Sequence, residues 1–204
     1  MLWVAHGISL TSGIGVLCAL IWRPRLPVHW WTLAFLTVAL AWDMLGWWMA
    51  AHGRPNHWLM NLWPPVAAAL ILPLLSSAAS PRHQDALWVA LVVFLGFWGL
   101  WTFSGWRPGS GLDDLTHPVG ALILASAALS VLVAQGRDAR LPFWRRAATW
   151  AAAGLFLGHL VDVVAWVALK AALPEPGQAA ALWTVRNVLW CGCNLMLGWS
   201  FRWA

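Results

Sequence analysis

Seven long apolar stretches alternate with short polar connections along this chain. About 20 residues of α-helix, rising 1.5 Å each, cross a hydrocarbon core of about 30 Å, so stretches of this length are typical of transmembrane helices. The connections are rich in proline and glycine, which end helices, and their shortness makes successive helices antiparallel neighbours. The predicted spans are Leu2–Trp22, Val28–Ala51, Asn56–Ala79, Ala86–Ser104, Asp114–Gln135, Trp144–Ala171 and Gln178–Trp203. We therefore expect an all-α, polytopic membrane bundle of seven transmembrane helices, with residues 1–204 forming a single domain.

The composition agrees with a membrane location. Of the 204 residues, 61% are hydrophobic and 9% are charged, against about 25% charged residues in soluble domains. The first stretch is followed by Arg23, Pro24 and Arg25 rather than by the small residues of a cleavage site. We therefore expect this stretch to remain as a span and not to be removed as a signal peptide.

The distribution of basic residues predicts how the bundle is oriented. Eight of them lie in the odd-numbered connections or after the last span: Arg23, Arg25, Arg82, Arg137, Arg140, Arg145, Arg146 and Arg202. Only Arg54, Arg107 and Lys170 lie in the even-numbered connections. Because basic connections stay in the cytoplasm, we expect the N-terminus outside and the C-terminus inside a bacterial-type inner membrane. This orientation accounts for the net charge of +5, so the lipid bilayer is an expected partner and nucleic acid is not.

Three formally charged residues lie deep inside the apolar stretches: Asp43, Asp162 and Arg186. Charged residues at this depth usually face the interior of a bundle, find a partner and carry function, because hydrocarbon solvates them poorly. Counting residues from the outer ends of their spans places all three roughly 12–14 Å below the outer surface. Spans six and seven are joined by a short connection, so the pattern predicts an ion pair between Asp162 and Arg186. Asp43 has no obvious partner.

Further polar residues occupy the same outer half and are predicted to line a pocket with the three charges. They are His6, Asn61, His117, His159 and Asn187. In the third predicted span, Pro64 and Pro65 remove two helix hydrogen bonds, and the carbonyls so freed need other partners or line a cavity. In the sixth, Gly154, Gly158 and Asp162 recur every four residues and predict a close helix approach.

These residues favour the binding of a small ligand or ion from the outer side, by a sensor-like or transport-related membrane component. Arg186 would anchor an anionic group, and Asp43 would accept a proton or a cation. No cofactor is implied, and the sequence leaves open whether the protein is an enzyme. Output of a signal would need a membrane or cytoplasmic protein partner.

Two alternatives stay open. In an intramembrane metal enzyme, His159 and Asp162, three residues apart on one helix face, would be metal ligands, with Asp43, His6 or His117 completing the set. In a structural or assembly subunit, Asp162 and Arg186 would simply join two helices. Four deep tryptophans, Trp42, Trp63, Trp98 and Trp190, are expected to pack inside the bundle.

Overall fold

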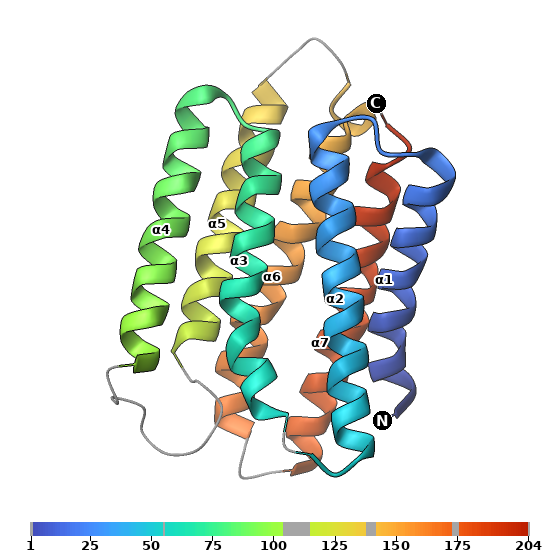
Figure 1. The fold of residues 1–204 in the computed structure, drawn as a ribbon, viewed down its shortest axis with the longest axis vertical. Coiled ribbons are helices and arrows are strands. Elements are labelled where there is room, and N and C mark those ends of the chain that lie inside the picture. Colours follow the sequence, from blue (N-terminus) through green and yellow to red (C-terminus); the bar gives the residue numbers. More distant parts are fainter. Residues whose placement is uncertain (1, 55, 104–114, 138–141, 173–175, 204) are drawn as a thin grey trace.

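Residues 2–54, 56–103, 115–137, 142–172 and 176–203 are described by a computed structural model, in which the side chains of 2–7, 57, 169–172 and 176 fall outside the description. These residues form seven α-helices and one short 3-10 helix. The helices are α1 (Leu2–Trp22), α2 (Pro27–Ala51), α3 (His57–Ser77), α4 (Pro81–Phe103), α5 (Thr116–Arg137), α6 (Ala147–Ala172) and α7 (Pro176–Ser200), with η1 (Phe143–Arg145) before α6. Successive helices run antiparallel, so the predicted seven-helix bundle is confirmed (Figure 1).

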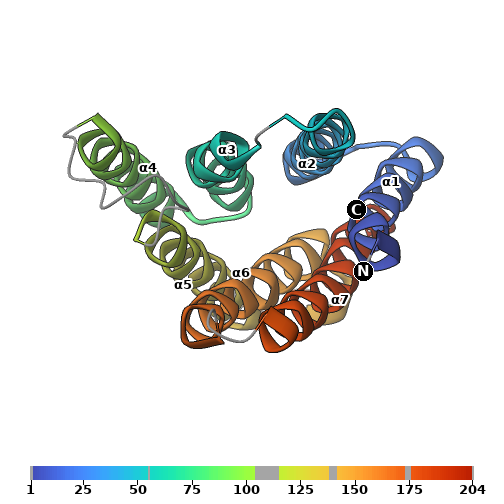
Figure 2. The ribbon, with the colours of Figure 1, turned by 90° about the horizontal axis from the view of Figure 1, so that it is seen from below.

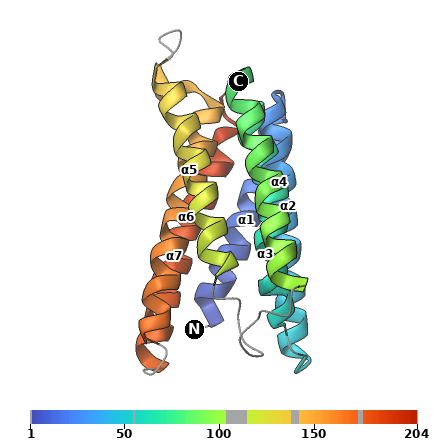
Figure 3. The same cartoon turned by 90° about the vertical axis from the view of Figure 1, so that its left-hand side faces the viewer.

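The helices form two layers that α1 joins along one side. Seen along the helix axes, α2, α3 and α4 lie on one side, α5, α6 and α7 lie on the other, and α1 packs between α2 and α7 (Figure 2). In the side view, the ribbons of α6 and α7 diverge from those of α2 and α3 toward the end at which α1 begins (Figure 3). The two ends of the bundle therefore differ in how closely the layers approach.

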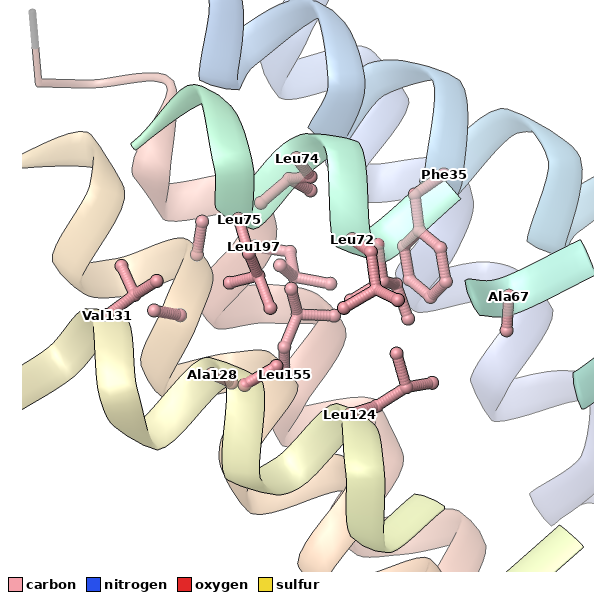
Figure 4. Close-up of a cluster of buried hydrophobic side chains, with 14 of the residues drawn as sticks. Phe35, Ala67, Leu72, Leu74, Leu75, Leu124, Ala128, Val131, Leu155 and Leu197 are labelled. Atoms are coloured by element: carbon pink, nitrogen blue, oxygen red, sulfur yellow. The ribbon is translucent and has the colours of Figure 1, made fainter. Parts of the chain in front are cut away.

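The apolar core fills the half of the bundle near the C-terminus. Leu72 and Leu75 of α3 meet Phe35 of α2, Leu155 of α6 and Leu197 of α7 there, and each of these side chains is at most 1% exposed (Figure 4). Because lipid tails are as apolar as leucine, this half is stabilised by close packing rather than by removal of apolar surface from water. The opposite half holds the three charged residues that were predicted to lie deep in the spans, Asp43, Asp162 and Arg186.

Five helices are long and apolar enough to cross a membrane, within the described ranges: α2, Trp58–Ser77 of α3, α4, α5 and Ala147–Ala168 of α6. The described apolar part of α1, Ile8–Trp22, is shorter. Helix α7 is less apolar because it carries Arg186, Asn187 and Asn194, yet its 25 residues extend roughly 37 Å, long enough to span. The chain is a membrane protein of the helical-bundle type.

Several helix ends differ from the prediction, and α4 differs most. It begins at Pro81, five residues before the predicted Ala86, because Pro81 fits the first helical position and the Ser80 carbonyl accepts the backbone N–H groups of His83 and Gln84. The polar residues expected in a connection therefore form the first turn. Helix α6 begins at Ala147 rather than Trp144, because the preceding residues form η1.

Small residues set the closest helix contacts, as predicted for α6. A Cβ atom added at Gly154 would lie 2.9 Å from the carbonyl oxygen of Cys193 in α7, and one added at Gly158 would lie 2.8 Å from the ring of Trp190. A similar contact joins α7 to α1, where a Cβ at Gly198 would lie 3.0 Å from the Cα of Gly15. These glycines allow α7 to pack closely between α1 and α6.

Candidate functional site

The predicted ion pair between α6 and α7 is present. Arg186 donates from Nε to Oδ1 of Asp162 at 2.7 Å, and the indole N–H of Trp190 donates to the same oxygen at 2.8 Å. The guanidinium also donates from Nη1 to Oδ1 of Asn187 at 3.1 Å and lies over the ring of Trp183, 4.6 Å from its centroid. Groups of α6 and α7 therefore hold the charge of Arg186 in place.

Asp43 of α2 has a partner that the sequence did not indicate. The hydroxyl of Ser9 in α1 donates to Oδ2 of Asp43 at 3.2 Å. The two residues meet because α1 and α2 are antiparallel and both lie about two turns from the same end of the bundle. This partner is neutral, and Asp43 forms no ion pair among the described residues.

A cavity of about 300 Å³ opens between α1, α2, α3 and α7 in the half where the layers diverge. Its lining residues are Ile8, Trp42, Asp43, Gly46, Trp47, Ala50, Asn56, Leu59, Met60, Trp63, Trp183, Arg186 and Asn187. Asp43, Gly46 and Ala50, three to four residues apart on α2, all face it. The cavity thus combines a carboxylate, a guanidinium and two amides with walls that include four indole rings.

Side chains from two other helices bind the carbonyls that the double proline frees in α3. Pro64 and Pro65 have no N–H to donate to the carbonyls of Met60 and Asn61, four residues earlier. Nε2 of His117 in α5 lies 2.6 Å from the Met60 oxygen, and the indole N–H of Trp98 in α4 donates to the Asn61 oxygen at 3.2 Å. Since a carbonyl only accepts, Nε2 of His117 carries the proton. The expected need for other partners is therefore met within the bundle.

His117 and His159 line a second cavity, separate from the first. It measures only about 20 Å³ and lies between α3, α5 and α6, with Asp162 also on its wall. His159 is 3% exposed; its Nδ1 lies 3.7 Å from Oδ2 of Asp162, and neither ring nitrogen has a hydrogen-bond partner among the described groups. The single polar layer predicted from depth is thus two compartments, with Asp162 between them.

The eight predicted site residues are accordingly distributed over several places. Asp43, Arg186 and Asn187 line the larger cavity. Asp162 does not line it, but accepts a hydrogen bond from Arg186. His117 and His159 line the smaller cavity, and Asn61 is buried in α3 without facing either. His6 lies on α1 one turn before Ser9, and its side chain is outside the described residues.

The metal-centre alternative gains no support from this geometry. In the part of the chain that the structure describes, no group of three or more His, Cys, Asp or Glu side chains comes together. His117 binds a backbone carbonyl and stacks on Trp166 at 4.6 Å, and Asp43 lies in the other cavity. His159 and Asp162 remain a pair.

Tryptophans are the site residues that sequence analysis missed. Trp42 and Trp63, expected to pack inside the bundle, form one corner of the larger cavity with ring centroids 5.7 Å apart. Trp183 lies three residues before Arg186 and so shares its helix face, a spacing that could have placed it under the guanidinium. Trp47 lies four residues after Asp43, so the same spacing rule could have placed it on the helix face of Asp43.

Comparison of the chain with protein-family models, with curated proteins and with solved structures finds no match. Any inference about function therefore depends on the chemistry of the two cavities.

Proposed function

We propose that this membrane protein binds a small ligand or ion in the larger cavity, as a sensor-like or transport-related component. The observation that carries the proposal is the cavity of about 300 Å³ whose wall presents Asp43 and Arg186. Cavities of small-molecule sites begin at about this volume and are mainly apolar with a few convergent polar groups. Buried charges in a membrane bundle usually mark such sites.

A binding role fits the geometry better than a purely structural one. A structural subunit needs only the pair of Asp162 and Arg186, with the space around it filled by side chains. Here the guanidinium instead lies at the edge of an unfilled space, opposite a carboxylate that has no ionic partner among the described residues.

A binding role also fits better than conduction through the bundle. Beyond the cavity, Asn194 of α7 donates to the hydroxyl of Ser12 in α1 at 3.0 Å, and these two residues are at most 2% exposed. The apolar core lies beyond them, toward the C-terminal end. The cavity therefore ends inside the bundle.

The proposal includes the membrane and the side from which the ligand enters. The basic connections favour a bacterial-type inner membrane with the cavity facing outward. A signal would leave through a membrane or cytoplasmic partner.

A cavity-filling variant tests the proposal. Gly46→Leu adds a side chain to the cavity wall, where a Cβ atom has 3.9 Å to its nearest neighbour, Leu59. Gly192→Leu is the matched control, because Gly192 is exposed on α7 with no neighbour within 4 Å of an added Cβ. A thermal-shift screen of small cations, anions and neutral compounds on purified protein should find ligands that stabilise the wild type and Gly192→Leu, but not Gly46→Leu. If no compound stabilises the wild type, or Gly46→Leu responds equally, the proposal fails.

A further inference from the structure

The charges around the larger cavity are unequal. Two carboxylates, Asp43 and Asp162, face one guanidinium, that of Arg186. Arg186 is already bound to Asp162 and Asn187, so its charge is largely neutralised on the α6 side. Among the described side chains, Asp43 receives a hydrogen bond only from the neutral hydroxyl of Ser9. One carboxylate in excess in a poorly solvating interior favours a ligand that brings a positive charge.

The walls of the cavity suit an organic cation. Four indole rings line it, those of Trp42, Trp47, Trp63 and Trp183. The face of an indole attracts cations electrostatically, and it does so more strongly where water is excluded. The protein already uses Trp183 in this way, with the guanidinium of Arg186 over its ring at 4.6 Å.

The size and the oxygen content of the cavity argue against a bare metal ion. A volume of about 300 Å³ could hold on the order of ten water molecules at about 30 Å³ each. Hard cations take about six to eight oxygen ligands, whereas the described part of this wall supplies one carboxylate, that of Asp43, and two amides, those of Asn56 and Asn187. An anion would meet Asp43 directly, and Nε and Nη1 of Arg186 already donate to Asp162 and Asn187.

From these observations we infer that the ligand is an organic ammonium ion, bound with its charge between Asp43 and the indole faces and its apolar part against Trp47 and Trp63. This inference rests on the proposed function, since it names the class of ligand for the same cavity. Arg186 then remains bound to Asp162 and Asn187 and forms part of the cavity wall. It does not anchor an anionic group of the ligand, whereas the sequence suggested that it would.

Four probes of nearly equal shape separate the charge types: choline, its neutral analogue 3,3-dimethylbutan-1-ol, the anion 3,3-dimethylbutanoate and the zwitterion trimethylglycine. Each is titrated into purified full-length protein in detergent, at constant ionic strength, with the melting temperature and equilibrium binding as readouts. Choline should bind at least about tenfold more tightly than the other three. Equal or tighter binding of any of the others, or no binding of choline, overturns the inference.

Two variants locate the binding. Asp43→Asn keeps an oxygen for the Ser9 hydroxyl but removes the charge, and it should weaken choline binding at least about tenfold with little effect on the neutral alcohol. Trp47→Leu should weaken choline by about threefold to tenfold, and it serves as the test if Asp43→Asn does not fold. Unchanged choline affinity in the folded variants contradicts the inference. If neutral or anionic compounds bind in a way that Gly46→Leu abolishes, the proposed function stands and only the ligand class is wrong.

Discussion

One oxygen of Asp162 accepts hydrogen bonds from both Arg186 and Trp190, while its other oxygen lies 3.7 Å from the ring of His159. At the scale of single residues, the polar half of this bundle is held by contacts of this kind, in which a polar group meets a group from another helix. Ser9 with Asp43 and Asn194 with Ser12 follow the same rule. In the hydrocarbon core of a bilayer, no water is available to bond a polar group that lacks a protein partner. The buried His159 departs from this pattern, since neither of its ring nitrogens has a hydrogen-bond partner among the described groups.

The double proline gives a residue-scale prediction. His117→Phe keeps an aromatic ring on Trp166 but removes the donor to the Met60 carbonyl, and it should destabilise the protein by about 1–3 kcal/mol. In a Pro64→Ala background the backbone N–H of residue 64 can reach that carbonyl, so the same substitution should cost less. Melting temperatures of the two single variants and the double variant in detergent measure this coupling.

The second proline provides a control, because each alanine substitution should compensate for the loss of only one of the two donors. Pro65→Ala restores a donor for the Asn61 carbonyl, so it should reduce the effect of Trp98→Phe and leave that of His117→Phe unchanged. Equal rescue of both substitutions by either alanine would show that relief of proline strain, and not the two hydrogen bonds, governs stability.

At the scale of elements, α7 joins α1 to α6 and contributes to the wall of the larger cavity. It contacts α6 through Gly154 and Gly158 and contacts α1 through Gly198, and it supplies Arg186 and Asn187 to the cavity. Its exposed face carries apolar residues such as Val185 and Val188. The polar residues that lower its hydropathy are therefore those that the other helices cover.

Substitution of these glycines gives the element-scale prediction. Gly154→Ala places a Cβ 2.9 Å from the Cys193 carbonyl oxygen, a backbone atom that cannot move aside without shifting α7, and should destabilise the bundle by about 1–3 kcal/mol. Gly192→Ala, on the exposed face of α7, should be neutral or stabilising by up to about 1 kcal/mol, because alanine favours the helix. Melting temperatures compare the two, and equal effects would mean that helix propensity alone matters.

At the scale of the whole molecule, the two halves of the bundle differ in packing and in the charged residues that they hold. The half near the C-terminus holds the apolar core of leucine, alanine and phenylalanine (Figure 4), and the other half holds Asp43, Asp162, Arg186 and the larger cavity. The antiparallel order of the helices places the connection at His52 at the cavity end and the first turn of α4, which holds His83, at the core end (Figure 1). A closely packed half thus adjoins a half that contains a cavity of about 300 Å³.

At this scale we predict the orientation of the bundle in the membrane, with the N-terminus outside and the C-terminus in the cytoplasm. With Cys18, Cys191 and Cys193 replaced by alanine, His52→Cys and His83→Cys each give a single exposed thiol at opposite ends of the bundle. In intact cells a membrane-impermeant maleimide should label only the cysteine at position 52, because the basic connections stay inside. Labelling of position 83 instead would show that the bundle has the opposite orientation, with the cavity on the cytoplasmic side.

The sequence by itself determined the helical membrane bundle, the approximate spans and the positions of the charged residues along their helices. Each of these depends on local pattern: apolar length sets a span, and residue number sets depth along a helix of constant rise. The pairing of Asp162 with Arg186 was also predictable, because a short connection forces α6 and α7 together. The Gly154 and Gly158 strip was predictable from its four-residue spacing on one helix.

Only the tertiary structure decided which residues at equal depth face the same space. Depth placed His159 with Asp43, but rotation about the helix axes places them in different cavities, and rotation depends on packing among all seven helices. The contact of Ser9 with Asp43, and those of His117 and Trp98 with α3, likewise join helices whose relative rotation no local pattern encodes. The same reason applies to the four indole rings in the cavity wall: position along the chain determines how far along its helix a tryptophan lies, and the packed bundle determines the direction it faces.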